Sequence, residues 1–573
     1  MAEPRQTQNF IRWTLIVAAL VLINVLAQMV FTRIDLTSEK RYSLNPVTKS
    51  MLKNLEDPVL IKFYLDGEMP SGFLRLKREA LQMLNEFRAI HRRFEIEIID
   101  PNSIEDRKER SNLMEQLQTL GLSPIQVEME DAGSMSRLTL FPGAIVSYGE
   151  KQMPMQLLSG QLNVSPESQI NGAVQNLEYT IASTIRALAS RQKASIGFVQ
   201  GLGQVADRKI ADIVQTLSMQ YEVSRLDLRE FPGDSVTGEI SLNRQLQRVN
   251  RFDALVIAKP TRPFTDMDKF LIDQFIMNGG KVLWCIDPVH ADMDSLSNAS
   301  EMLAYPIFDE LRIGDMLFRY GVRLNTDLIV DKKAAWLSDM QRVRPWVYWP
   351  LITSRSKHPI AKDLNAIKAE FVSSIDTVMA EGIKKTPLLM SSSNSKVVPT
   401  PHVVSLEKYY NFPKDEIFPQ SFIPIAYLLE GEFESIFANR IMPKMGREED
   451  VPFVARGKST AQVVIADGDI IKNQVNITNP NIDRGLPLPL GFDQFTGIQY
   501  GNKDFLLNVF DYLLDPENLI KIRSRELKIR LLDTSKVREQ YNFWVLLNTA
   551  GPIVILLLLG LANHLLRKRK YAK

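Results

Sequence analysis

The stretch FDALVIAKPTRPFTDMDKFLIDQFIMNGGKVLWCIDP, residues 252–288, contains two short apolar runs separated by a longer segment. Both runs are rich in β-branched residues and end at Pro, Gly or Asp, which is typical of strands. The segment between them, near Thr265–Asn278, has the apolar spacing of a helix. A strand, helix and strand joined in this way indicate two parallel strands of one sheet.

The same alternation extends in both directions from this stretch. ASIGFVQG, DRKIADIVQTLSMQ and YEVSRLDL precede it as strand, helix and strand, and FIPIAYLLEGE and AQVVIADGDII follow it as strands. A helix near Asn502–Leu514 comes next, with Asn502 as its expected N-cap and Asp515-Pro516 as its stop. We expect an α/β fold with a doubly wound sheet that resembles class I glutamine amidotransferases without their catalytic residues. The stretch 331–401 is harder to interpret, and we expect an insertion with long loops.

A second α/β unit lies nearer the N-terminus. PVLIKFYL, a helix with Phe73, Leu76, Ala80, Leu84 and Phe87 at helical spacing, and FEIEIID form strand, helix and strand. A polar helix near 104–120 follows, then the strand candidates SPIQVEM, FPGAIVSYG and QMPMQLL, and a long helix near 171–190. This order resembles a thioredoxin-like fold. The unit contains no cysteine, so CxxC redox chemistry is excluded.

Two apolar runs at the ends of the chain have the length of membrane spans. Trp13 to Phe31 carries no charge, and Phe543 to Leu566 carries only His564. The basic cluster from Arg567 to Lys573 after the second run favours cytoplasmic termini and a middle region outside the cytoplasm. An alternative is that the first run is a signal peptide cleaved near Ala27. Neither Gly nor Pro lies between Glu517 and Trp544, so a helix can continue from the middle region into the second span.

Composition excludes several classes of protein. The chain has 573 residues, a net charge of +2 and 45% apolar residues, which excludes general disorder and gives no electrostatic case for nucleic acid. Its one cysteine, Cys285, excludes disulfides within the chain, and its five histidines form no HExxH pair. The P-loop pattern is also missing, so ATP hydrolysis would require another chain.

Three patterns have a possible chemical meaning. Gly201, Gly203 and Ala206 after a strand, with Asp227 further on, match a dinucleotide fingerprint. Because nicotinamide cofactors are cytoplasmic, we favour a simple strand-to-helix turn, where Gly203→Ala would be tolerated if a Cβ fits. Cys285 lies in the apolar VLWCID, which favours a buried thiol over a nucleophile.

The third pattern is acidic. Asp287, His290, Asp292 and Asp294 follow a strand, where α/β sheets bind ligands, so a cation site is an alternative to a capping loop. Asp467-Gly468-Asp469 is a similar acidic motif, which we interpret as a turn between strands. We expect no catalytic residue, no metal and no cofactor.

Several segments together resemble one known family. They are RYSLNPVTKSMLKNLEDPV, IPIAYLLEGEFESIFANR, VVIADGDIIKNQV and YGNKDFLLNVFDYLLDPENLIKIRSRELKIRLLD. The chain is similar to the GldG family, the auxiliary membrane subunits of the gliding-motility ABC transporter of Bacteroidetes. The resemblance implies an ABC permease and a cytoplasmic ATPase as partners, and a link to gliding and adhesin secretion. It transfers no catalytic residue.

The resulting expectation is a non-catalytic auxiliary subunit of an ABC transporter in the inner membrane, with a large periplasmic region. The alternative is an exported hydrolase or metal-dependent enzyme with a cleft near Asp287–Asp294. Small and polar residues in the spans should contact the permease, namely Asn24, Gln28, Asn548, Thr549, Gly551 and Pro552. The expected boundaries are a tail (1–12), a span (13–31), the thioredoxin-like domain (32–192), the amidotransferase-like domain (193–532, with the insertion at 331–401), a juxtamembrane helix (533–542), a span (543–566) and a basic tail (567–573).

Overall fold

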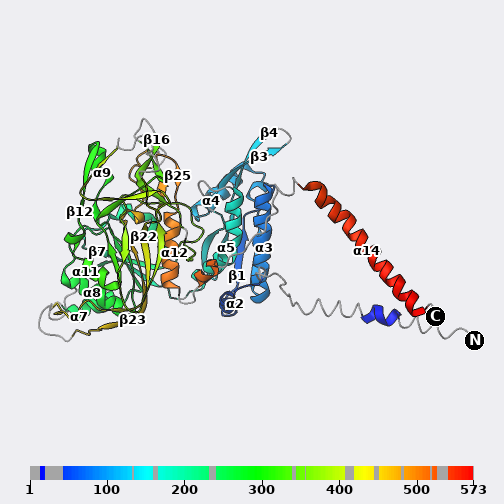
Figure 1. The fold of residues 1–573 in the computed structure, drawn as a ribbon, viewed down its shortest axis with the longest axis horizontal. Coiled ribbons are helices and arrows are strands. Elements are labelled where there is room, and N and C mark those ends of the chain that lie inside the picture. Colours follow the sequence, from blue (N-terminus) through cyan, green and yellow to red (C-terminus); the bar gives the residue numbers. More distant parts are fainter. Residues whose placement is uncertain are drawn as a thin grey trace, which may run out of the picture. The chain divides into compact units, whose positions relative to one another are not determined.

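The computed structural model divides the chain into two compact units, Met1–Glu526 and Leu527–Lys573 (Figure 1). It describes residues 13–19, 43–131, 134–158, 166–190, 192–231, 241–338, 343–354, 356–406, 418–443, 451–478, 483–515, 519–524 and 540–571. Most of the first expected span therefore lies outside the described residues, and so does the chain between Ser524 and Gln540.

The first part of the larger unit is built on a four-stranded sheet of order β2-β1-β5-β6. Strand β1 (Val59–Phe63) pairs in parallel with β2 (Phe94–Ile98) and antiparallel with β5 (Gly143–Tyr148), and β5 pairs antiparallel with β6 (Lys151–Gln156). The helices are α2 (Pro46–Lys53), α3 (Ser71–Ile90), α4 (Arg107–Thr119) and α5 (Pro166–Ala189). Helix α3 buries the five apolar residues that its spacing predicted, from Phe73 to Phe87, which confirms that element.

Strand β4 (Ser134–Leu140) in this part was not expected. The predicted strand SPIQVEM forms β3 (Ile125–Asp131), and β3 pairs with β4 in a separate hairpin and not with the four-stranded sheet. The sequence SMSRLTL of β4 is largely polar, so its hydrophobic pattern gave no signal for a strand.

The second part is built on a seven-stranded sheet of order β19-β22-β23-β10-β9-β7-β8. The strands are β7 (Ser195–Gln200), β8 (Glu222–Asp227), β9 (Ala254–Ala258), β10 (Lys281–Cys285), β19 (Ile383–Met390), β22 (Pro424–Glu434) and β23 (Arg456–Ile465). Strands β8, β7, β9, β10 and β23 are parallel, as expected. Strands β22 and β19 are antiparallel, so the sheet is mixed and not uniformly parallel.

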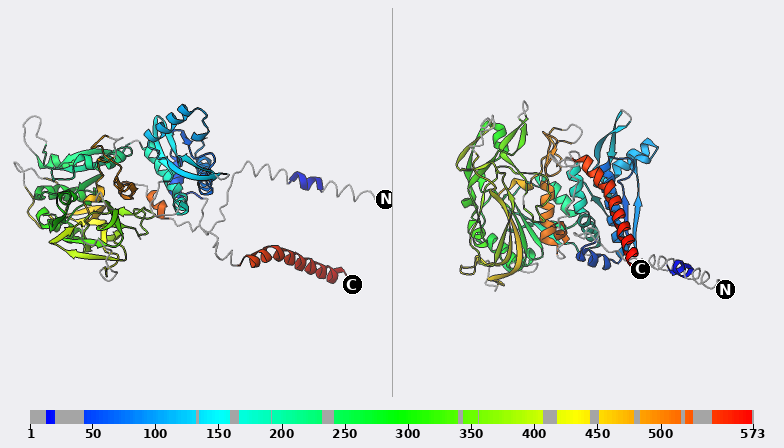
Figure 2. Two further views of the ribbon diagram at one scale, coloured as in Figure 1. Left: turned by 90° about the horizontal axis from the view of Figure 1, so that it is seen from above. Right: turned by 45° about the vertical axis from the view of Figure 1, so that its right-hand side comes forward.

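Helices cover both faces of this sheet, which explains why its central strands β9 and β10 are almost entirely apolar (Figure 2). Alternate residues of β10 point to opposite faces: Trp284 packs with α7 (Leu242–Val249) and α8 (Asp266–Met277), and Leu283 packs with α6 (Ala211–Ser218) and α12 (Asn502–Leu514). Helix α12 has the predicted bounds, but its N-cap is Gly501 and not Asn502. The Asn502 side chain instead bonds the backbone of Lys368.

The stretch 331–401 is not a set of long loops. It contains β15 (Ala334–Ser338), β16 (Val343–Ile352), β17 (Ile367–Lys368), β18 (Ile375–Thr377), β19 and β20 (Ser395–Pro399), paired antiparallel with one another or with neighbours. Proline and serine within these strands weaken the alternation that would have identified them.

Short elements complete the larger unit. They are η1 (Pro101–Ser103), η2 (Asp207–Lys209), β11 (Val289–His290), α9 (Met293–Asn298), β12 (Glu301–Pro306), α10 (Phe308–Leu311), α11 (Gly314–Tyr320), β13 (Val322–Leu324), β14 (Asp327–Asp331), β21 (His402–Ser405), η4 (Asp469–Ile471), β24 (Phe492–Asp493), β25 (Ile498–Gln499) and η5 (Leu519–Ser524). The last of these is a 3-10 helix where the sequence predicted the start of a continuous α-helix.

The smaller unit contains α14 (Tyr541–Tyr571), which includes Pro552. Within the described residues, one helix is long and apolar enough to cross a membrane, Tyr541–Arg569, with a mean hydropathy of 2.3. A membrane-capable helix at the C-terminus is therefore confirmed.

Candidate functional site

Four charged side chains meet where the central parallel strands end. Lys259 follows β9, Asp287 follows β10, and Asp467 and Asp469 follow β23. Because the carboxyl ends of neighbouring parallel strands share one edge of a sheet, residues distant in sequence come together here. The three carboxylates are buried, and an oxygen of each lies within 4.8 Å of the others.

Lys259 lies between two of these carboxylates. Its Nζ is 2.8 Å from Oδ2 of Asp287 and 2.6 Å from Oδ2 of Asp469. Lys472 approaches the other oxygen of Asp469 at 2.7 Å. The Lys259 backbone has a φ of +50°, in the left-handed region that L residues rarely adopt. Gly468 permits this packing, since a Cβ there would lie 2.8 Å from Cβ of Lys259.

The pKa values follow from this arrangement. Burial tends to lower the pKa of Lys259, but the two carboxylates outweigh it and raise that pKa well above its usual value. Burial tends to raise the pKa of Asp469, but Lys472 and Lys259 hold it well below the usual range. Burial raises the pKa of Asp467 well above the usual range, with the neighbouring Asp287 and Asp469 adding to the effect.

This arrangement is better suited to a structural ion-pair network than to a metal centre. The Lys259 ammonium already occupies the position between Asp287 and Asp469 that a cation would take. Asp467 accepts hydrogen bonds from the backbone N–H groups of Asp469 and Ile470 through Oδ1, and from Glu370 through Oδ2. Sequence reasoning identified the aspartates in two separate motifs but missed Lys259. In the sequence, Lys259 is distinguished only by its position directly after an apolar strand.

The rest of the DPVHADMD motif does not join Asp287. His290 is exposed in β11 and packs on Tyr305, with ring centroids 4.9 Å apart. Asp292 caps α9 by accepting from the backbone N–H of Asp294, which itself pairs with Lys209 at 3.4 Å. Asp292 therefore has the expected capping role, and the four residues do not form one cation site.

A neighbouring loop packs against the glycine turn that resembles a dinucleotide fingerprint. The backbone N–H groups of Thr261 and Arg262 both donate to the carbonyl of Leu202, at 3.0 and 2.9 Å. A Cβ on Gly203, whose φ is +67°, would lie 2.4 Å from Oγ1 of Thr261. The condition under which we expected Gly203→Ala to be tolerated is therefore not met. The 3-10 turn η2 also separates the glycines from α6, so they do not open that helix directly.

Cys285 is fully buried in β10, as predicted. Burial raises the pKa of its thiol well above the usual value, and the carboxylates of Asp467 and Asp287 add to this shift. A thiol in this environment stays protonated, which disfavours a role as nucleophile.

A cleft of about 1040 Å³ lies where the two parts of the larger unit meet. One wall comes from α2 and the end of α5, and the other from the amino-terminal ends of β9 and β10, the middle of β23 and the end of α12. Its lining mixes apolar and polar groups and includes Asn54, Arg186, Tyr221, Lys281, Glu430 and Asp515. Clefts between domains are frequent ligand sites.

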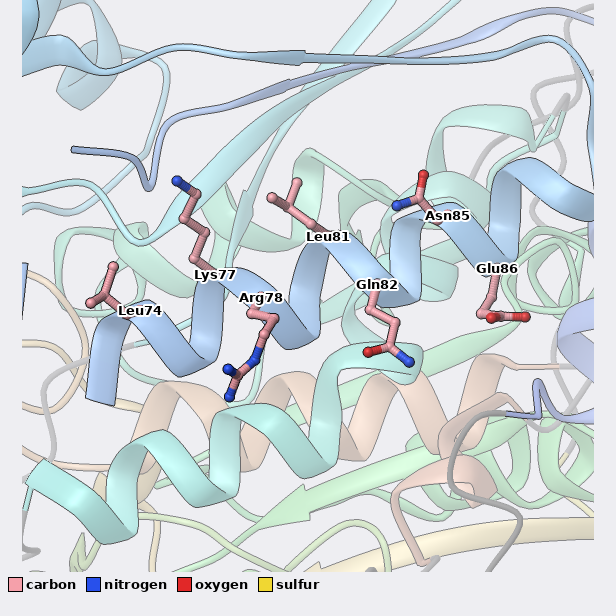
Figure 3. A pocket seen from close by; sticks show the side chains of 7 residues that line it. All are labelled: Leu74, Lys77, Arg78, Leu81, Gln82, Asn85 and Glu86. Carbon is pink, nitrogen blue, oxygen red and sulfur yellow. The ribbon is translucent and has the colours of Figure 1, made fainter. Parts of the chain in front are cut away.

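A second hollow, of about 630 Å³, runs along the outer side of α3 (Figure 3). All of its lining residues come from this one helix: Leu74, Lys77, Arg78, Leu81, Gln82, Asn85 and Glu86. Without a second wall, it is a surface groove and not an enclosing pocket.

His358 lies near the cleft and makes a pH-dependent contribution to stability. Its ring packs edge-on against Tyr512, whose hydroxyl donates to Glu430 at 2.5 Å. Burial lowers the pKa of His358 from 6.5 to about 4, against the opposing effect of Glu430. The folded state therefore favours the neutral ring. That stabilisation is complete above pH 6.5 and is lost as the pH falls toward 4.

We expect acidification from pH 7 to pH 4 to lower the free energy of unfolding by about 1–2 kcal/mol through this partly buried ring, and His358→Gln to remove that contribution. Urea unfolding of wild type and variant across this range measures the difference. His290→Gln, at an exposed histidine, is the matched control and should leave the profile unchanged. Identical profiles for His358→Gln and wild type would contradict the assignment.

Of the side chains expected to contact a permease, those described lie in α14. Asn548 donates to the backbone carbonyl of Trp544 at 2.9 Å, and Thr549 donates to that of Val545 at 2.7 Å. Apart from its chain neighbours and the nearby backbone of its own helix, no described heavy atom lies within 4 Å of a Cβ placed on Gly551. Asn24 and Gln28 lie outside the described residues.

Comparisons with known proteins place the chain in a family. An uncharacterized protein of Borreliella burgdorferi is 20% identical over 550 residues, covering 94% of each chain. A solved structure named mmIFT52 N-terminal domain matches with a TM-score of 0.32 and 14% identity, covering 56% of this chain and 98% of that one. Residues 38–147 match a domain of unknown function. Residues 193–509, more than half of the chain, match the family described as an ABC-type uncharacterized transport system. The chain therefore belongs to this family and is an auxiliary protein of an ABC transport system.

Proposed function

We propose that this chain is a non-catalytic, membrane-anchored auxiliary subunit that works beside an ABC permease and a cytoplasmic ATPase. The observation that carries this proposal is the family match over residues 193–509 in a chain that ends in a membrane-capable helix. Asp287 and Asp469 at the sheet edge are buried and paired with Lys259, so they are not free to act as catalytic acids or bases. This supports a binding or coupling role over catalysis.

The proposed topology has two spans, 13–31 and 543–566, with the region between them in the periplasm and both termini in the cytoplasm. The basic residues that end α14, including Arg567, Lys568 and Arg569, support this orientation. Protease added to spheroplasts should degrade the middle region and spare a tag at Lys573.

The two parts of the middle region are proposed to be a thioredoxin-like domain and an amidotransferase-like domain. The order β2-β1-β5-β6, with only the first pair parallel, supports the former. The parallel order β23-β10-β9-β7-β8 supports the latter. The cleft between them is the proposed place where the subunit holds a substrate or a periplasmic partner. Participation in gliding and adhesin secretion rests on the family resemblance.

Affinity purification of the tagged full-length chain from native membranes tests the assignment. A permease and an ATPase should co-purify, because an auxiliary subunit acts within their complex. A chain without residues 541–573 is the matched control and should retain less of both. If neither partner co-purifies with the intact chain under mild detergent, the proposal fails.

Within this complex, Gly551 is proposed to lie at a helix–helix contact. Gly551→Leu should reduce permease recovery several-fold, because small residues allow membrane helices to approach closely. Gly560→Leu, at another glycine of α14, is the matched control. Equal loss with both variants, or no loss with Gly551→Leu, would contradict this interface.

A further inference from the structure

The last described segment before the membrane helix, η5, is packed into the larger unit. Leu519, Ile520 and Ile522 are buried in the apolar core of the first part, beside α5. Segment η5 thus packs in the core of the first part, although it follows α12 of the second part in sequence.

The next residue, Arg523, contacts the second part. Its guanidinium donates to the side-chain oxygen of Asn508 on α12 and, at 3.2 Å, to the carbonyl of Lys362. Lys362 returns the contact, with Nζ donating to the carbonyl of Arg523 at 3.0 Å. The same guanidinium lies 5.5 Å from the ring of Tyr179 on α5. Arg523 therefore touches both halves.

Two acids of the α12 end make further contacts across the junction. Asp511 accepts from the hydroxyls of Tyr179, in the first part, and Tyr221, in the second. Asp515 pairs with Arg186 of α5 and accepts from the backbone N–H of Ile520, at 3.1 Å. All of these groups are largely withdrawn from water, where such bonds are strongest.

These contacts lie beside the cleft between the two parts, since Arg186, Tyr221 and Asp515 also line it. We propose that residues 519–524 act as a strap that ties the two walls of the cleft together and sets its width. In sequence, the strap is the last described segment of this unit before α14. This inference deepens the proposed coupling function and rests on it.

Spin labels on the two walls, at Asn54→Cys and Ser459→Cys, report the width of the cleft in the full-length chain in lipid nanodiscs. Both positions are exposed, and Cys285 is buried away from the label. With Arg523 intact we expect a narrow distance distribution. Arg523→Met should broaden it and shift it to longer distances. Hydrogen exchange of residues 187–190 should rise about tenfold, while the interiors of both sheets, including Ser459–Ala461 of β23, remain protected.

Arg225→Met is the matched control. This arginine is exposed and pairs with Asp207 at 2.7 Å, so its loss should change neither measurement. Arg523→Lys keeps the charge but not the planar fork, and it should give the same changes in smaller degree if Arg523→Met does not fold. Changes confined to residues 519–524, or equal changes in the control, would overturn the strap. Recovery of the permease is measured separately. The distance and exchange measurements therefore test the strap, and the co-purification tests the proposed function.

Discussion

Lys259→Met is expected to lower the free energy of unfolding by about 3–5 kcal/mol, because it leaves two buried carboxylates without their shared cation. Asp287 and Asp469 lie on separate turns at the end of the sheet, and Lys259 Nζ is within 2.8 Å of both. Lys472 still contacts Asp469, at 2.7 Å, whereas the ion pair of Asp287 is with Lys259 itself. The carboxylate of Asp287 would then have to take up a proton or admit water.

Urea unfolding of the full-length protein in detergent, followed by the fluorescence of its tryptophans, measures this loss. Arg323→Met is the matched control, because its exposed pair with Asp376, at 2.6 Å, should be worth less than about 1 kcal/mol. Adding Asp287→Asn to Lys259→Met should recover part of the loss. The prediction would be contradicted if Lys259→Met lowered the free energy of unfolding no more than the control and EDTA destabilised the wild type. In that case a bound cation, and not Lys259, would neutralise these carboxylates.

The elements with local signals were predictable from the sequence. Helix α3 has five apolar residues on one face, and α8 is preceded by its N-cap Thr265, whose side chain and that of Asp268 form a reciprocal cap. Strands β9 and β10 are apolar runs bounded by turn residues, and both faces of their sheet are covered. In each case, the information lies within a few neighbouring residues.

The remaining features depend on contacts between distant residues. Strand β19 joins the large sheet only by pairing with β22, about forty residues further on, and its direction is set by that pairing. The Lys259 network likewise joins three turns that follow different strands. Sequence patterns place each turn at the end of a strand, but strand order decides which turns become neighbours. The alternative cation site, in which His290 and Asp292 would accompany Asp287, does not form for the same reason: the chain turns away into β11 and α9.

A second large effect is expected at Asp273, a fully buried carboxylate on α8. Its Oδ1 accepts from the Tyr320 hydroxyl at 2.8 Å and from the backbone N–H of Ile436 at 3.0 Å. Its Oδ2 accepts from the Ser435 hydroxyl at 2.6 Å and from the Gln274 amide at 2.9 Å. These donors come from α8, α11 and the turn after β22, so one side chain holds three elements together.

Asp273→Ala should cost about 4 kcal/mol, because it leaves buried donors without an acceptor and opens a small cavity. Asp273→Asn should cost less, since the amide keeps the shape and one acceptor oxygen. Glu310→Ala, at an exposed acid on α10, is the control and should change stability by less than about 0.5 kcal/mol. Urea unfolding of the full-length chain measures the free energy of unfolding of the three variants and so ranks their stability. If the alanine and asparagine variants were equally stable, the loss could not come from the unsatisfied donors, because only the alanine variant removes every acceptor at this position.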